Sequence, residues 1–277
     1  MEEQLPRRRK SYQVPSCFAK KSGFWGSFQD ALCCGTLNKD EPFSQELLST
    51  FYVLSEYANE TFDAANRRHI ENFGKLFSLV FPGRKAPENP SVSELWPEFG
   101  FQTSRAFSDL RFGGILSLEA MIRISESNPE KVSSIMAYMK ERGNFLFACS
   151  VISVTFFLKS FFHFGLIQSG KSLRSLKKLS SNTAAAYFLS LIDPYLPDER
   201  KKESFLSLVE VYSLQLFDYW KELDEEEELN IAYFTQVEER FEKMFSHLVE
   251  RWARKIKQPH SLQEFLVALK QHQFSTS

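Results

Sequence analysis

Residues 96–118 of the chain read WPEFGFQTSRAFSDLRFGGILSL, and the interpretation of the whole sequence depends on them. The composition is unusual for a connector between helices, because it includes an indole, three glycines, and an aspartate and an arginine two positions apart. Gly100 allows a positive φ angle or a close approach of two backbones. The pair Gly113-Gly114 ends the irregular part, and a helix is expected to follow over about residues 115–126.

Upstream of this segment, apolar residues recur at steps of three and four, which is the spacing of one face of an α-helix. Two helices are predicted there, and the second ends at the Phe81-Pro82-Gly83 stop, before a loop over 83–92. The apolar positions are Leu47, Leu48, Phe51, Leu54 and Tyr57 in the first helix, and Ile70, Phe73, Phe77 and Val80 in the second. Core packing is the simplest role for both faces.

Downstream, a helix is predicted to begin at Asn128-Pro129, with the asparagine as its cap, and to end at Gly143. The run from Phe145 to Leu158 is uncharged and apolar, and it predicts a central buried helix over 144–164. This run of 14 residues is short for a membrane span, which needs about 20. A transmembrane helix is therefore the weaker alternative.

Two long amphipathic helices are predicted next, and a last helix over 261–272 follows Pro259. Their apolar positions are Phe205, Leu208, Tyr212, Leu216, Tyr219 and Leu223 in the first, and Phe234, Val237, Phe241, Met244, Leu248 and Trp252 in the second. The acidic run from Asp224 to Glu228 is interpreted as a solvated turn between them. No segment has a convincing strand pattern, so the predicted fold class is all-α, with amphipathic helices packed around the central apolar helix.

Three parts are predicted along the chain: a disordered basic tail over 1–42, the helical domain over 43–256, and a C-terminal helix and tail over 257–277. The N-terminal tail contains the basic cluster Arg7 to Lys10 and the pair Cys33-Cys34. Plain thiols in a loop are the simpler interpretation of these cysteines. The alternative is S-palmitoylation beside the basic cluster, which would give peripheral association with internal membranes.

Charge and residue spacing exclude several classes of function. The net charge of −1 argues against nucleic acid as a partner. The four cysteines lack the spacing of metal ligands, so neither a metal nor a cofactor is expected. No secretory signal is evident, which favours a cytoplasmic location. Residues 165–172, GLIQSGKS, match the P-loop expression, but a P-loop follows a strand and here an apolar helix comes first. We interpret them as a linker.

The segment over 96–118 resembles the signature of ELMO domain-containing proteins. That signature is a Trp, three residues, Gly-Phe-Gln, three residues, and then Pro-x-Thr-Asp-Phe-Arg-Gly-x-Gly-x-Leu-x-Leu. The matching positions are Trp96, Gly100, Phe101, Gln102, Asp109, Arg111, Gly114, Leu116 and Leu118. The resemblance covers about residues 45–250. It departs where Ala106, Ser108, Leu110 and Phe112 replace the family's Pro, Thr, Phe and Gly.

Family members with this arginine activate GTP hydrolysis by Arf-family small GTPases. The resemblance therefore implies a GTP-bound Arf-family GTPase as partner and Arg111 as the catalytic arginine finger. A guanidinium supplied in trans neutralises the charge that builds on the phosphoryl oxygens in the transition state. Asp109 would orient Arg111 or cap the following helix. Trp96, Phe101 and Gln102 would hold the loop rigid.

Alternatives stay open at this point. Arg111 could pair with Asp109 or a core carboxylate and only stabilise the loop. The chain could also be a non-catalytic scaffold or adaptor that binds a small GTPase or its exchange factor, an interpretation that the bulky Phe112 beside the arginine favours. Gly100, Phe112 and Gly114 are candidate partner-binding or site-supporting residues under either interpretation.

Overall fold

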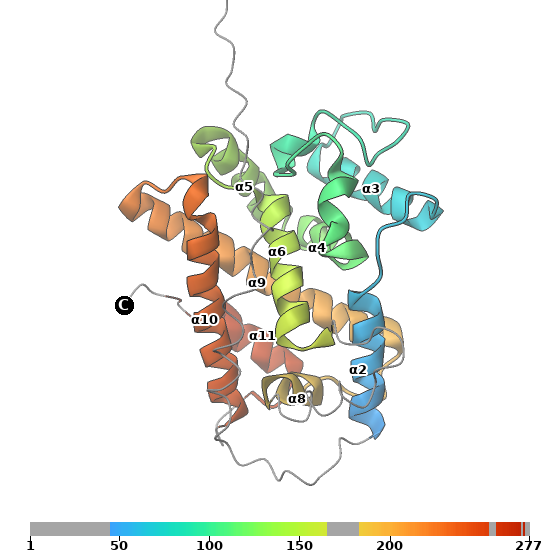
Figure 1. The fold of residues 1–277 in the computed structure, drawn as a ribbon, viewed down its shortest axis with the longest axis vertical. Helices are drawn as coiled ribbons and strands as arrows, with labels where there is room; N and C mark the ends of the chain where they lie inside the picture. The colour runs from blue at the N-terminus through green and yellow to red at the C-terminus, as the bar shows by residue number, and fades with distance from the viewer. Residues whose placement is uncertain (1–44, 165–182, 255–258, 273, 275–277) are drawn as a thin grey trace, which may run out of the picture. The chain divides into compact units, whose positions relative to one another are not determined.

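In a computed structural model of the protein, the structure describes residues 45–164, 183–254, 259–272 and 274, all within one compact unit (Figure 1). The α-helices are α2 (Gln45–Ala58), α3 (Arg67–Val80), α4 (Gly114–Ser127), α5 (Pro129–Arg142), α6 (Phe147–Phe161), α8 (Thr183–Ser190), α9 (Asp198–Glu227), α10 (Phe234–Ala253) and α11 (Leu262–Gln271). Short 3₁₀ helices are η1 (Trp96–Phe99), η2 (Ala106–Arg111) and η4 (Ile231–Tyr233). The described residues form no strand beyond one isolated bridge between Val92 and Arg105. The predicted all-α class is confirmed.

Helix α6 is the apolar helix expected at the centre. Twelve of its 15 residues are buried, so it is covered on nearly every side. It lies between α4 and α10 and packs on α9, the long helix that also contacts α2, α4, α10 and α11 (Figure 1). No single described helix is long and apolar enough to cross a membrane. Helices α5 and α6 pass that test only as a pair, and they meet at a 116° bend.

Helix α5 begins at Pro129, as predicted, but Asn128 does not cap it through its side chain. The Asn128 amide instead donates to Oε1 of Glu210 on α9 at 2.8 Å. Glu210 also pairs with Arg123 on α4 at 2.7 Å. The asparagine therefore joins the α4–α5 turn to α9, a role that depends on a residue 82 positions away.

The prediction of a solvated turn over the acidic run was wrong for Asp224. Helix α9 continues to Glu227, and Asp224 is only 2% exposed. Its carboxylate accepts hydrogen bonds from the Tyr138 hydroxyl at 2.6 Å, Arg142 Nε at 2.9 Å and Asn144 Nδ2 at 2.7 Å. Burial alone would raise the pKa of Asp224, but these hydrogen bonds outweigh it and hold the pKa below its usual value. Asp224 thus holds the α5–α6 junction on α9.

Two interpretations from the sequence lie outside the described residues. These are the basic, cysteine-bearing tail over 1–42 and the P-loop-like stretch over 165–172. The domain boundaries at residues 42 and 256 stay predictions. Helix α11, beyond the second boundary, packs against α9, and its Phe265 is buried beside Trp252 of α10.

Candidate functional site

Trp96 fixes the start of the signature segment to α3. It opens η1, is fully buried, and meets the rings of Phe73, Phe77 and Phe81 edge-on at centroid distances of 5.6 to 5.8 Å. Its indole N–H donates to the Pro90 carbonyl at 2.9 Å. Because the large apolar surface is buried and the polar atom is paired, the indole is a stable anchor.

Gly100 brings the segment against the N-terminus of α6. Its φ is +95°, and a Cβ atom there would lie 2.3 Å from the backbone nitrogen of Phe147. Its carbonyl accepts from the Cys149 N–H at 3.2 Å, which satisfies one of the unpaired donors in the first turn of α6. The next residue, Phe101, is buried against Trp96. Only glycine allows this contact between two backbones.

Asp109 closes the loop between η1 and η2. Its Oδ2 accepts from the backbone N–H of Gln102 at 2.8 Å, while the Gln102 side chain is exposed. Burial raises the pKa of Asp109, and the hydrogen bonds from Gln102 and Ser108, together with the charge of Arg111, oppose that rise. The expectation that Asp109 caps α4 is wrong, because the cap position is Gly113 and no side chain bonds there.

Arg111 is the last residue of η2, and its side chain is exposed. Its Nε donates to the Ser108 carbonyl at 2.8 Å, so the guanidinium folds back along η2. Among the described residues no carboxylate forms an ion pair with Arg111, Asp109 included. The carboxylate pair expected of an arginine that only stabilises the loop is therefore not found in the described part of the chain, and the bond to Ser108 is the local contact that Arg111 makes there.

The two glycines after Phe112 fix the segment from the other side. Gly114 has φ +60°, and a Cβ atom there would lie 2.2 Å from the Glu60 carbonyl oxygen. That oxygen accepts from the Ile115 N–H at 3.0 Å. A Cβ on Gly113 would lie 1.7 Å from the Ser117 hydroxyl oxygen. The sequence identified the glycine pair, whereas Glu60 was not foreseen because it lies more than 50 positions upstream.

Phe112 lies between Arg111 and this glycine pair. Phe112 is 38% exposed, and its ring meets Phe156 of α6 edge-on at a centroid distance of 6.2 Å. Of the predicted site residues, the exposed ones are Gln102, Arg111 and Phe112, and the last two are neighbours in the chain. The buried ones, Trp96, Gly100, Phe101 and Gly114, form the frame behind them.

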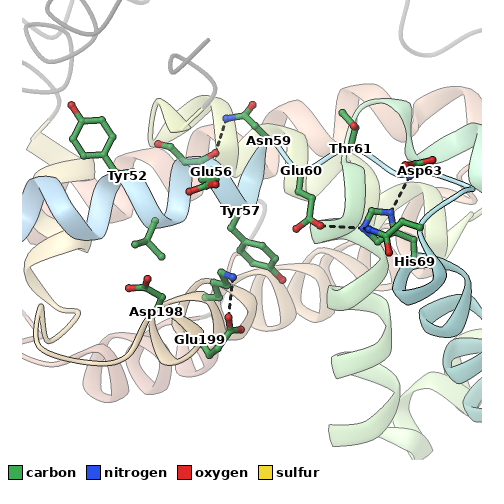
Figure 2. A pocket seen from close by; sticks show the side chains of 14 residues that line it. Tyr52, Glu56, Tyr57, Asn59, Glu60, Thr61, Asp63, His69, Asp198 and Glu199 are labelled. Carbon is green, nitrogen blue, oxygen red and sulfur yellow. Dashed lines mark hydrogen bonds and ion pairs between the residues drawn. The ribbon is translucent and has the colours of Figure 1, made fainter. Parts of the chain in front are cut away.

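A groove of about 940 Å³ opens beside this frame, between α2, the loop after it and the start of α9 (Figure 2). Figure 2 shows Glu60 in this groove, with its carboxylate directed to His69 at 3.1 Å. Among the described residues that line the groove, the carboxylates belong to Glu56, Glu60, Asp63, Asp198 and Glu199, and the one lysine is Lys202. Such a wall repels phosphate, which argues against a nucleotide site here. Among the described residues no group of side chains has the arrangement of a metal site.

The model of the ELMO/CED-12 family matches residues 52–265. The chain is 34% identical over 86 residues to ELMO domain-containing protein A of Dictyostelium discoideum, which is 31% of this chain and 9% of that protein. It is 33% identical over 76 residues to human ELMO domain-containing protein 2, which is 27% of this chain and 25% of the relative. The aligned part thus covers a quarter or less of each of these two relatives. No solved structure matches the chain.

Proposed function

The chain belongs to the ELMO/CED-12 family, and on this premise we propose that it is a GTPase-activating protein for Arf-family small GTPases. The observation that supports the proposal most is that Arg111 is exposed and uses only part of its hydrogen-bonding capacity on the described residues. This arginine is exposed, stands at the end of a segment fixed at several points, and uses one donor on the Ser108 carbonyl. The remaining donors of its guanidinium make no hydrogen bond to any other described residue.

In the proposed chemistry, Arg111 enters the partner's site from outside and adds a positive charge there. During GTP hydrolysis, negative charge spreads over the phosphoryl oxygens, and the planar fork of a guanidinium donates to two of them at once. An arginine finger accelerates hydrolysis by about 10³–10⁵, which corresponds to about 4–7 kcal/mol of transition-state stabilisation. The protein needs no metal or nucleotide of its own for this role.

Arg111 must leave the Ser108 carbonyl in order to reach a partner. An intramolecular hydrogen bond of this kind contributes about 0.5–1.5 kcal/mol, which is small beside the gain at the transition state. The backbone around Arg111 stays fixed, since Asp109 holds Gln102 on one side and Gly114 packs on Glu60 on the other. A mobile side chain on a rigid backbone suits a group that has to enter another protein's site.

The test is single-turnover GTP hydrolysis by a panel of GTP-loaded Arf-family GTPases, with the full chain added at increasing concentration. Arg111→Lys keeps the charge but removes the fork, and we expect it to lower the maximal acceleration by at least about 10²-fold. Arg105→Lys is the matched control, because Arg105 is an exposed arginine directly before η2. The proposal would be contradicted if Arg111→Lys accelerated hydrolysis as much as the unaltered chain does. It would also be contradicted if the unaltered chain accelerated hydrolysis by no GTPase of the panel.

The second candidate is a non-catalytic module that binds a small GTPase or its exchange factor. Phe112 favours it, because the family signature has glycine at this position and a bulky ring beside Arg111 changes the surface that a partner meets. Under this alternative the chain binds the GTP-loaded GTPase but leaves its hydrolysis rate unchanged. The same titration, combined with a direct binding measurement, separates the two candidates.

A further inference from the structure

Phe112 is the direct neighbour of Arg111 in the chain and lies close to any protein that receives Arg111. An extended arginine side chain reaches about 7 Å from its Cα, and neighbouring Cα atoms are about 3.8 Å apart. A phosphate that Arg111 contacts therefore lies within about 11 Å of the Phe112 Cα, a distance that falls inside a standard protein interface of about 800 Å² per partner. Since Phe112 is 38% exposed, its ring is either part of that contact surface or an obstacle to it.

The structure holds Phe112 in place from two sides. Its backbone is in the right-handed helical region, with φ −100° and ψ −36°, directly before the tightly packed Gly113-Gly114 pair. Its ring rests edge-on against Phe156 on α6, the helix buried along most of its length. An aromatic side chain that is already held loses little conformational freedom when a partner covers it.

The exposed ring also limits what can lie opposite. Its face and edge offer no strong hydrogen-bond donor or acceptor, so a polar or charged group covered by the ring would lose its water without gaining a partner. An apolar surface would instead gain from the burial of the ring. Aromatic residues at the centre of an interface are among those whose removal weakens binding most.

We infer that Phe112 is a specificity-determining contact, which directs Arg111 to GTPases with an apolar recess beside the nucleotide site. The inference rests on the proposed function of Arg111. Under this inference, Phe112 in place of the signature's glycine selects the partner and does not obstruct Arg111. Two activities are thereby divided between neighbouring residues: Arg111 acts on the transition state, and Phe112 acts on the affinity and on the choice of GTPase.

The experiment titrates the full chain against each GTPase of the panel and measures the half-saturating concentration and the maximal hydrolysis rate separately. For the preferred GTPase, Phe112→Ala is expected to raise the half-saturating concentration about tenfold, as removal of a central aromatic contact does, and to leave the maximal rate nearly unchanged. Phe112→Leu keeps an apolar group and is expected to recover most of the affinity. Tyr195→Ala is the control, because Tyr195 is an aromatic residue that is 84% exposed, in the turn before α9.

An unchanged half-saturating concentration in Phe112→Ala would overturn the inference. A higher maximal rate in this variant would also overturn it, because that result means that the ring obstructs Arg111. If the unaltered chain accelerates no GTPase, the proposed function fails on its own. In that case, the role of Phe112 is tested by measuring the affinity of each variant for GTPases loaded with a non-hydrolysable GTP analogue. Weaker binding by Phe112→Ala than by Tyr195→Ala supports the contact, and equal or absent binding overturns it.

Discussion

The carbonyl oxygen of Glu60 lies 2.2 Å from the position that a Cβ atom would take on Gly114, and it accepts a hydrogen bond from the next residue, Ile115, at 3.0 Å. Two backbones are therefore in direct contact where the loop after α2 meets the first turn of α4. Arg111 stands three residues before this contact. The orientation of the proposed finger thus depends on a buried glycine that packs on the backbone of Glu60.

Gly114→Ala is expected to lower the free energy of unfolding by about 2–4 kcal/mol. The positive φ costs an alanine about 1–2 kcal/mol, and the added methyl group overlaps a backbone oxygen that no side-chain rotation can move. Gly143→Ala is the matched control: it has φ +66° but nothing within 4 Å of its Cβ position, so it incurs only the backbone cost. Urea unfolding of both variants checks this, and equal losses would contradict the steric argument.

Gly74→Ala is expected to stabilise the protein. Gly74 lies inside α3, and a Cβ atom there would meet Pro90 Cγ at 3.6 Å, an ordinary van der Waals distance. Alanine is favoured over glycine by about 0.5–1 kcal/mol in a helix interior. A rise of about 1–4 °C in the thermal midpoint is the expected readout. A lower midpoint would mean that α3 and the loop at Pro90 are packed more tightly than this distance indicates.

Asp109→Ala is expected to release the backbone of Gln102. Loss of the acceptor leaves that N–H without its carboxylate partner and loosens the loop that leads to Arg111. A hydrogen bond of about 1 kcal/mol corresponds to several-fold faster amide exchange at Gln102, which hydrogen exchange followed by NMR measures. Asp109→Asn retains an acceptor oxygen and is the control. Unchanged exchange in Asp109→Ala would show that Asp109 does not hold the loop.

Asp224→Asn is expected to lower the free energy of unfolding at pH 7 by about 2–3 kcal/mol, because a buried acceptor of three hydrogen bonds is replaced. The folded-state pKa of Asp224 is held below its ordinary value, because the hydrogen bonds from Arg142, Tyr138 and Asn144 outweigh the effect of burial. The carboxylate therefore stabilises the fold above about pH 4, and this contribution is lost as the pH falls through the lowered pKa.

The difference between the unaltered chain and Asp224→Asn should accordingly shrink between pH 7 and pH 3, as measured by urea unfolding. Asp218→Asn is the control on the same helix, because Asp218 is largely exposed and pairs with Lys131 at the surface. A surface pair of this kind contributes less than about 1 kcal/mol. A difference for Asp224 that stays constant with pH would contradict the lowered pKa.

Residue spacing alone predicted most of the α-helices and several of their ends. Apolar spacing gave α2, α3, α9 and α10, and local chemistry gave the ends at Gly143 and Pro129, because both kinds of information lie within a few neighbouring residues. The uncharged run on α6 indicated the buried centre for the same reason. The signature over 96–118 indicated the family, which the match over 52–265 confirms.

The partners of the polar side chains depend on the packing of the helices and could not be predicted from neighbouring residues. Asp224 was predicted to be solvated, yet it accepts a hydrogen bond from Asn144, 80 positions away. Asn128 was predicted to cap its own helix, yet its side chain donates to Glu210 on α9. The contact of Gly114 with Glu60, and the acidic groove between α2 and α9, likewise join segments that are distant in the chain. Periodicity is a property of a short window, whereas burial and hydrogen bonding of a polar group depend on which surfaces the packed helices bring together.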